Sequence, residues 1–148
     1  MQKKDNKIAI GADHAGYLMK EHIKQELEGR GYEVTDYGTH SENSVDYPDF
    51  AHPVGKSIDK GEFSQAVVIC GSGNGVNMTV NKYSLVRSAL CWNKEIAKLA
   101  RQHNDANVLA LPARFISFKE GSDILEAFLN SAFEGGRHIK RVKKICKE

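Results

Sequence analysis

The chain has 148 residues, enough for one folded domain, residues 1–148, to close a hydrophobic core without disulfides or structural metals. Hydrophobic residues make up 41% and charged residues 27%, a composition that excludes a largely disordered chain. The formal net charge of +2 gives no global preference for nucleic acid or a membrane surface, so any anion site must be local.

Five short runs of apolar or β-branched residues predict β-strands, because each run is mostly apolar, as in a strand covered on both faces. The predicted strands are 7–11, 33–37, 66–70, 88–92 and 107–111. The residues before them, 1–7, are polar and predict a short unpacked lead-in. No apolar run approaches the roughly 20 residues of a membrane-spanning helix, so we expect no membrane segment.

Longer amphipathic stretches between these strands predict helices at 17–30, 49–60 and 93–101. The first carries Met19, Ile23 and Leu27 at a spacing of four, which places them on one apolar stripe. The second follows Pro48 and carries Phe50, Val54 and Ile58. Pro53 fits that helix only within its first turn, and Asn93 is the predicted N-cap of the third.

Two more helices are predicted toward the C-terminus. Residues 122–133 direct four apolar side chains toward the core, namely Leu125, Phe128, Leu129 and Ala132. After Gly135 and Gly136, residues 137–147 form a basic helix whose apolar stripe consists of Ile139, Val142, Ile145 and Cys146. Because an apolar stripe must pack against something, we expect this last helix to contact a second subunit.

The alternation of strands and helices predicts an α/β fold with a parallel sheet. Residues 38–48, GTHSENSVDYP, are polar, show no periodic pattern and follow the second strand directly, so they are expected to form a loop. Open α/β sheets bind their ligands at the carboxyl ends of the strands. The residues that follow the predicted strands are therefore the candidate site.

The segment VVICGSGNGVN carries the strongest local signal, because an apolar strand runs directly into Gly71, Gly73 and Gly75 and then into a predicted helix. The backbone N–H groups of such a turn suit a phosphate, a carboxylate or a developing oxyanion. A tight structural turn is the alternative. The dinucleotide pattern G-x-G-x-x-G fails at Val76, and no Gly-Lys-Ser/Thr follows to make a P-loop.

Cys70 lies between this strand and the glycine turn. A helix start favours the thiolate form of a nearby cysteine, and a thiolate can act as a nucleophile or a base. The alternative is a small residue of the core. Cys91 and Cys146 have no such turn and are interpreted as structural. Three cysteines at wide spacings, with no C-x-x-C pair, favour the reducing cytoplasm.

A second polar group follows the first strand in the segment GADHAG, where Asp13 and His14 offer an acceptor and a proton-exchanging or phosphate-binding group. The alternative is that Asp13 only caps the next helix. His103 ends a predicted helix, a position where histidines usually stabilise the helix dipole. The remaining histidines form no metal-binding pattern such as H-E-x-x-H, so no metal site is predicted.

Basic residues form the third candidate group. Arg114 follows the fifth strand, whereas Arg137 and Arg141 are four residues apart and are expected to share one helix face. Two guanidinium groups on one face suit a phosphate monoester. Lysines surround the last two arginines, so a solvated tail or a weak nucleic-acid patch is the alternative.

Five segments occur together in this order: GADHAG, DYPDFA, ICGSGNG, RQHNDANVL and EGGRHIKRV. With these motifs the chain resembles the ribose-5-phosphate isomerase B family from about residue 8 to residue 142. The resemblance implies a Rossmann-like, doubly wound, three-layer α/β/α sandwich with a five-stranded parallel sheet. It also implies a homodimer or a tetramer, with an active site built between subunits and with no metal or organic cofactor.

The same resemblance implies a reaction and a role for each candidate residue. The enzyme would interconvert ribose 5-phosphate and ribulose 5-phosphate through a cis-enediolate, in the non-oxidative pentose phosphate pathway of the cytoplasm. Cys70 would move the proton between C2 and C1, and Ser72 would contact the sugar or relay a proton. Backbone amides that hold the enediolate oxygen would come from Gly71, Gly73, Asn74 and Gly75.

The remaining implied roles concern the ring and the phosphate. His103 and Asp13 would assist opening of the furanose ring, and Asn104 and Tyr47 would orient sugar hydroxyls. The phosphate would be held by His14, Arg114, Arg137 and Arg141. Some family members carry a glutamate at the position of Val76 and lack the cysteine, which places this chain with the members that use a thiol base.

Three alternative functions remain open. The family also includes galactose-6-phosphate isomerase subunits and an activity on allose 6-phosphate, so a six-carbon substrate is one alternative. A non-catalytic nucleotide- or phosphometabolite-binding module is the second, because Gly11, Gly16 and Asp36 partly match a dinucleotide site; the middle glycine of that pattern is missing, and a pure binding module has no need of Cys70 beside an anion-binding turn. A nucleic-acid binder that uses the basic C-terminus ranks last, and it predicts steep salt dependence and tolerance of Cys70→Ala.

Overall fold

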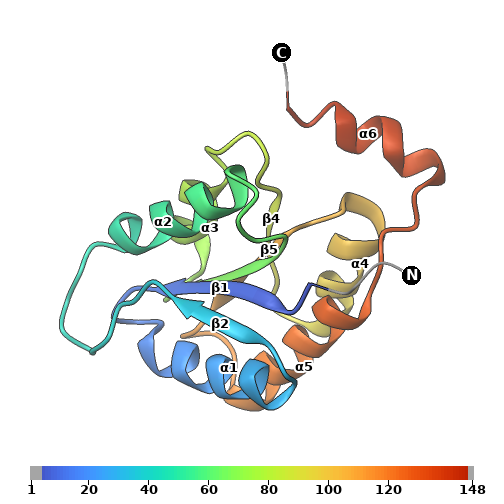
Figure 1. Cartoon of the computed structure of the whole chain (residues 1–148). Coiled ribbons are helices and arrows are strands. Elements are labelled where there is room, and N and C mark those ends of the chain that lie inside the picture. The colour runs from blue at the N-terminus through green and yellow to red at the C-terminus, as the bar shows by residue number, and fades with distance from the viewer. Residues whose placement is uncertain (1–4, 147–148) are drawn as a thin grey trace.

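The computed structural model describes residues 5–146, and its five parallel strands form one sheet in the order β2-β1-β3-β5-β4 (Figure 1). The strands are β1 (Lys7–Ala12), β2 (Glu33–Asp36), β3 (Ala66–Cys70), β4 (Ser88–Leu90) and β5 (Val108–Pro112). All five predicted strands are confirmed, with ends that differ by at most two residues. The predicted lead-in lies outside the described residues for positions 1–4.

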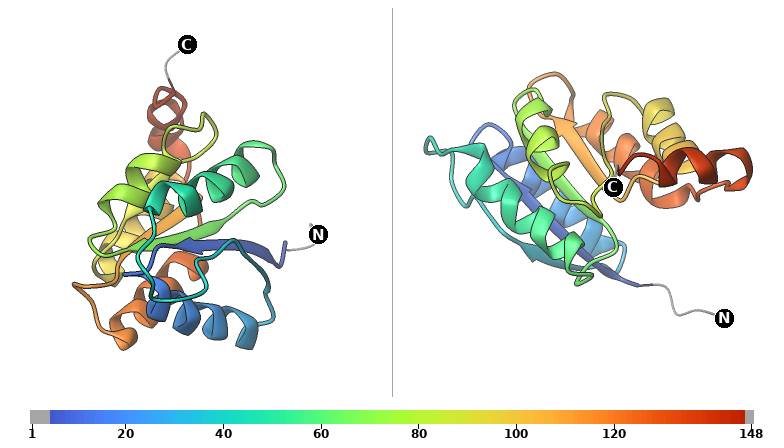
Figure 2. Two further views of the ribbon diagram at one scale, coloured as in Figure 1. Left: turned by 90° about the vertical axis from the view of Figure 1, so that its left-hand side faces the viewer. Right: turned by 90° about the horizontal axis from the view of Figure 1, so that it is seen from above.

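Helices cover both faces of the sheet. One face carries α1 (Tyr17–Gly29), α4 (Lys94–Asn104) and α5 (Phe118–Asn130). The other face carries α2 (Tyr47–Asp59) and α3 (Asn74–Val80). The left view of Figure 2 shows the teal and green helices above the sheet and the blue and orange helices below it. The predicted doubly wound α/β/α sandwich is therefore confirmed.

The direction of each crossover determines the face that its helix covers. The crossovers that contain α2 and α3 run along the sheet toward β4. The crossovers that contain α1 and α4 run in the opposite direction, toward β2. Because parallel crossovers are right-handed, movement in opposite directions along the sheet places helices on opposite faces. The order therefore reverses between β1 and β3, which makes their carboxyl ends the switch point of the sheet.

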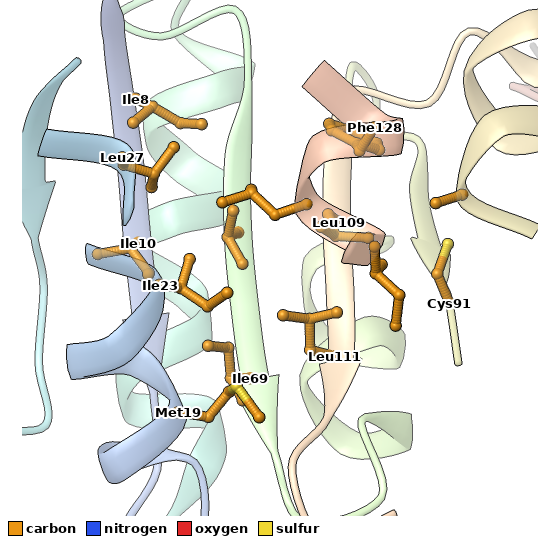
Figure 3. Packing of buried hydrophobic residues seen from close by; sticks show 14 of the residues in the cluster. Ile8, Ile10, Met19, Ile23, Leu27, Ile69, Cys91, Leu109, Leu111 and Phe128 are labelled. Atoms are coloured by element: carbon orange, nitrogen blue, oxygen red, sulfur yellow. The ribbon is translucent and has the colours of Figure 1, made fainter. Parts of the chain in front are cut away.

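Alternation along the central strands divides the core into two clusters. In β1, Ile8 and Ile10 face α1, whereas Ala9 faces α2. Leu109 and Leu111 of β5 join the first cluster, whose packing is shown in Figure 3. Because both faces are covered, β3 and β5 are buried at every position, which explains their continuous apolar sequences.

Two helices depart from prediction. The helix α2 begins at Tyr47, so Pro53 lies inside the helix rather than in its first turn, and Pro48 occupies the first turn instead. The helix α5 begins at Phe118, because Ser117 and Glu120 form a reciprocal capping box that precedes the apolar stripe. Since α5 ends at Asn130, the expectation that Ala132 points into the core is wrong, and this residue is exposed.

The predicted C-terminal helix over 137–147 begins as a 3-10 turn and ends earlier than expected. A 3-10 turn, η1 (Gly136–His138), precedes the short helix α6 (Ile139–Lys143), and residues 147–148 lie outside the described part. Gly135 and Gly136 both have positive φ, which turns the chain away from α5. Ile139 and Ile145 remain 43% and 57% exposed. Packing of this stripe on a second subunit stays a prediction.

The helices of the described region do not meet the requirements for a membrane span, since none combines sufficient length with an apolar sequence.

Candidate active site

The switch point of the sheet brings the first two candidate groups together. Asp13 and His14 follow β1, and Cys70 ends the neighbouring strand β3. The Asp13 N–H donates to the carbonyl of Ile69 at 3.3 Å, so the two strand ends are joined directly. Two of the three candidate groups, far apart in the sequence, therefore lie side by side at one edge.

Asp13 is held against this edge by the start of α1. Its carboxylate oxygen Oδ1 accepts the N–H of Gly16 at 3.0 Å, and the residue is only 7% exposed. A Cβ at Gly16 would lie 2.7 Å from the carbonyl oxygen of Ile69, so the close approach requires glycine. Asp13 therefore holds the turn before α1 with one of its two carboxylate oxygens, whereas the N-cap of the helix itself, Gly16, has no side-chain cap.

Cys70 is 5% exposed and is followed at once by the glycine turn. Gly73 has a φ of 79°, a left-handed conformation that favours glycine and lets α3 begin at Asn74. The Ser72 hydroxyl accepts the N–H of Asn74 at 3.3 Å. Among residues 5–146, the amides of Ser72 and Gly73 donate to no protein acceptor, so they are available to an oxyanion.

Two side chains lie over this turn. A Cβ placed on Gly75 would lie 2.6 Å from Cζ of Tyr47, so the tyrosine ring rests directly on the backbone at the start of α3. A Cβ placed on Gly71 would lie 3.3 Å from Cδ and 3.4 Å from Nη1 of Arg114. The thiol, the amide-rich turn, a phenol and a guanidinium therefore share the carboxyl edge of the sheet.

His14 connects the loop after β2 to this edge. Its Nδ1 accepts the N–H of Val45 at 3.1 Å. An accepting Nδ1 carries no proton, so the neutral ring bears its proton on Nε2, which can donate to an anion. The predicted loop over 38–48 is confirmed up to the start of α2 at Tyr47.

A buried ion pair holds the beginning of the same loop. Nζ of Lys20 lies 2.6 Å from Oδ2 of Asp36, and these side chains are 0% and 8% exposed. The other oxygen of Asp36 accepts the N–H of Gly38 at 2.8 Å. Burial alone would raise the pKa of Asp36, but the hydrogen bonds from Lys20 and Gly38 and the charge of Lys20 lower it below its ordinary value.

The other candidate residues lie at the opposite, amino edge of the sheet. His103 and Asn104 end α4, just before β5 begins at Val108. β3 and β5 are parallel, with Ala66 opposite Val108 and Cys70 opposite Pro112. A strand of five residues spans about 13 Å, so His103 and Cys70 lie at opposite ends of the sheet within one chain.

Four functional candidates gather at this amino edge. They are His103, Asn104, Arg137 and Arg141. The Glu134 N–H donates to the carbonyl of Gln102 at 3.0 Å and fixes the C-terminal segment on α4. Arg137 lies in the 3-10 turn η1 and Arg141 in α6, which follows η1 directly; both are exposed, and a shared helix face stays a prediction.

His103 is not the isolated helix-end residue that the sequence suggests. Its ring stacks on that of His138 with centroids 4.3 Å apart, and its Nε2 lies 3.5 Å from Oε1 of Glu134. Burial, followed by the nearby charges of His103 and Arg137, lowers the pKa of His138. Sequence reasoning missed Glu134 and His138 as members of this group, although both lie in the segment EGGRH.

His22, His52 and Cys91 have structural surroundings. His22 hydrogen-bonds to Ser122 at 2.7 Å, and His52 to the hydroxyl of Tyr83 at 2.7 Å. Cys91 is fully buried, and burial raises its pKa to about 12, which keeps it a neutral thiol. Lys20 and Asp36, which hold the loop, are further residues that the sequence analysis did not single out as a pair.

The doubly wound sheet, with a thiol and an amide-rich turn at its switch point, places the chain among the Rossmann-like α/β enzymes that act on small molecules. The family model for ribose/galactose isomerases matches residues 8–145. The chain belongs to this family.

Several relatives are similar over nearly their whole length. Ribose-5-phosphate isomerase B of Escherichia coli is 41% identical over 139 residues, which cover 94% of this chain and 93% of that protein. A crystal structure of a ribose 5-phosphate isomerase from Thermotoga maritima has a TM-score of 0.94 at 45% identity and covers 98% of this chain and 100% of its own. The Mycoplasma genitalium ribose-5-phosphate isomerase B, crystallised with bound ribulose-5-phosphate, has a TM-score of 0.91 at 40% identity. The match covers 95% of this chain and 94% of that chain.

Proposed function

We propose that this chain is an aldose–ketose isomerase that interconverts D-ribose 5-phosphate and D-ribulose 5-phosphate. The observation that carries the proposal is the position of Cys70, at the switch point of the sheet and directly before a turn whose amides are free to bind an oxyanion. Family membership and relatives named ribose-5-phosphate isomerase B support the choice of substrate.

The reaction moves one proton between neighbouring carbons and needs no external redox partner. Cys70, as the thiolate, removes the proton from C2 of the open-chain aldose, and the electron pair moves onto the C1 oxygen to form the cis-enediolate. The O2 proton then passes to O1, with Ser72 as a relay, and the thiol returns its proton to C1. Amides from Gly71 to Gly75 stabilise the enediolate, because a carbon next to a carbonyl is too weak an acid for the thiolate alone.

The other residues bind and orient the sugar phosphate. Asp13 and His103 assist opening of the furanose ring, which must precede proton transfer, and Tyr47 and Asn104 hold sugar hydroxyls. The phosphate is bound far from the reacting carbons, so its binding energy fixes the position of the sugar. The phosphate ligands that we propose are His14, Arg114, Arg137 and Arg141.

Two copies of the chain are needed to assemble this site. Cys70 lies at the carboxyl edge of the sheet and His103 at the amino edge, about 13 Å apart along the strands even before their lateral separation. A second copy that presents its amino edge to the first copy's carboxyl edge would complete two equivalent sites. The exposed Ile139 and Ile145 supply apolar surface for that contact.

A panel of aldose phosphates tests the proposed reaction. Ketose formation from ribose 5-phosphate should exceed that from allose 6-phosphate and galactose 6-phosphate, and deuterium from solvent should appear on C1 of the ketose product. Preference for a six-carbon substrate, the alternative that the ribose/galactose family leaves open, would overturn the assignment of the pentose. Turnover of none of these sugars would overturn the isomerase proposal itself.

Mixing two inactive variants tests the shared site. Cys70→Ala lacks the carboxyl-edge base, and a His103→Ala/Arg137→Ala double variant lacks the amino-edge groups. In a 1:1 mixture after subunit exchange, heterodimers contain one intact site, so activity should return to about a quarter of the wild-type level. No recovery, despite exchange shown by mass spectrometry, would mean that each site lies within one chain.

We also place the protein in the cytoplasm. Its three cysteines are unpaired, and Cys146 is exposed, as expected for a chain kept in a reducing compartment.

A further inference from the structure

Three ligand-type side chains converge outside the switch point. They are His103 at the end of α4, Glu134 in the segment after α5, and His138 in η1. Nε2 of His103 lies 3.5 Å and Nε2 of His138 lies 3.8 Å from the same oxygen, Oε1 of Glu134. One ligand atom from each residue lies within 4.8 Å of the other two.

The backbone holds this arrangement in place. Glu134 donates its N–H to Gln102 at the end of α4, and His138 donates its N–H to Gly135 at 3.1 Å. The two imidazole rings are stacked nearly parallel, at 15°, and His138 is only 8% exposed, so the more exposed ring of His103 must turn for both nitrogen lone pairs to point at one ion. Both imidazoles direct the same nitrogen toward one carboxylate oxygen, which brings two nitrogens and one oxygen together.

We infer that His103, Glu134 and His138 bind a divalent transition metal ion, with Zn²⁺ as the preferred ion. Two imidazoles and one carboxylate are a set of three protein ligands that leaves a fourth position for water. In tetrahedral zinc sites the ligand atoms lie about 3.3 Å apart, so the two distances to Glu134 need little change, whereas the two imidazole nitrogens, which lie within 4.8 Å of each other, must approach by up to about 1.5 Å. The His103 side chain is 38% exposed at the end of α4, where it can move by that amount.

The charge around the site limits its affinity. Arg137 lies in the same 3-10 turn as His138 and disfavours a cation there, whereas Glu134 supplies one negative charge. We therefore expect a weak, reversible site rather than a permanently occupied one.

Metal binding would occupy Nε2 of His103, and this consequence rests on the proposed function. If His103 assists opening of the sugar ring, the bound ion prevents proton exchange at that nitrogen and inhibits isomerisation. Metal binding would then inhibit the reaction reversibly. The sequence predicts no metal site, because the two histidines belong to different elements and form no local motif.

Metal titration of the full, untagged chain tests the site. In a Cys146→Ser background, which removes the exposed thiol, calorimetry with Zn²⁺ should give one equivalent per chain. Glu134→Gln and His138→Gln should each weaken binding at least about tenfold, whereas the matched control His52→Gln should leave it unchanged. Glu134 is exposed, so Glu134→Gln remains informative if His138→Gln does not fold.

Two results would overturn the site. One is binding that Glu134→Gln does not weaken, and the other is a thiolate-to-metal charge-transfer band when Co²⁺ replaces Zn²⁺, which would assign the ion to a cysteine. Inhibition of the wild type by Zn²⁺ is measured separately. Saturable binding without inhibition would support the metal site and would contradict the ring-opening role proposed for His103.

Discussion

The two edges of the sheet place functional groups in different ways. At the carboxyl edge, Cys70 and Asp13 are 5% and 7% exposed and are held by backbone contacts at a glycine turn. At the amino edge, the His103 and Glu134 side chains are 38% and 52% exposed and project from helix ends and an irregular segment. One chain therefore fixes the proposed reaction centre at the first edge, whereas the groups at the second edge face outward.

This difference follows from what each half of the proposed reaction needs. Stabilisation of an enediolate requires donors fixed before the charge develops, and backbone amides in a tight turn meet that requirement. Recognition of a phosphate can use long charged side chains, and the exposed arginines of the C-terminal segment 136–143 provide them. In a dimer, the C-terminal segment of one chain would lie at the glycine turn of the other, so one site would combine enediolate stabilisation with phosphate recognition.

The largest expected effect comes from removing the thiol at the carboxyl edge. Cys70→Ala should lower kcat about 10³-fold, because it removes the base while leaving the phosphate contacts in place. Ribose 5-phosphate binding, measured by calorimetry, should remain detectable. The matched control is Cys91→Ala, which removes a buried thiol outside the switch point and should leave kcat unchanged. Near wild-type turnover of Cys70→Ala would exclude the thiol as the base.

Sequence reasoning recovers the carboxyl edge because its determinants are local. The strand, the cysteine and the glycines lie within VVICGSGNG, and the parallel pattern already places strand ends together. The grouping of His103 with Glu134 and His138 joins an α4 residue to the C-terminal segment, and no local spacing encodes it. The break at Gly135 and Gly136 is predicted, whereas the 3-10 turn that follows it and the end of the last helix at Lys143 are not.

The ion pair that holds the loop beside the carboxyl edge should have the next largest effect. Asp36→Asn leaves the buried Lys20 with the partly exposed carboxylate of Glu21, 2.8 Å away, in place of two carboxylates, which should lower the free energy of unfolding by about 3 kcal/mol, the low end for a broken buried pair. Because the pKa of Asp36 is lowered in the folded state, its stabilisation is present above the ordinary pKa of 3.8 and is lost as the pH falls below that value.

Urea unfolding at several pH values measures this contribution. The difference between wild type and Asp36→Asn should be constant near neutral pH and shrink below pH 3.8. Asp123→Asn, which breaks the exposed pair with Lys119, is the matched control and should cost less than about 0.5 kcal/mol. Equal losses in the two variants would show that the buried pair gives no special support to the loop.

A methyl group added at Gly75 tests whether the position of the Tyr47 ring at the carboxyl edge matters for activity. In Gly75→Ala the new methyl group would meet the Tyr47 ring at 2.6 Å and displace it, so kcat/KM should fall about 100-fold while the fold persists. Gly29→Ala, where a Cβ meets no atom within 4 Å, is the control and should keep full activity. If Gly75→Ala also kept full activity, the Tyr47 ring would have no part in orienting the sugar.

A substitution at the amino edge should have a smaller effect, and the effect should be on KM rather than on kcat. Arg137→Ala removes one proposed phosphate contact, which acts equally on the bound substrate and the transition state, so KM should rise about tenfold with little change in kcat. Lys140→Ala removes a neighbouring exposed charge that we assign no contact, and its KM should change far less. A loss confined to kcat in Arg137→Ala would instead assign this arginine to the reacting end of the sugar. The C-terminal segment 136–143 would then reach the thiol, and the two edges would not have the separate roles proposed above.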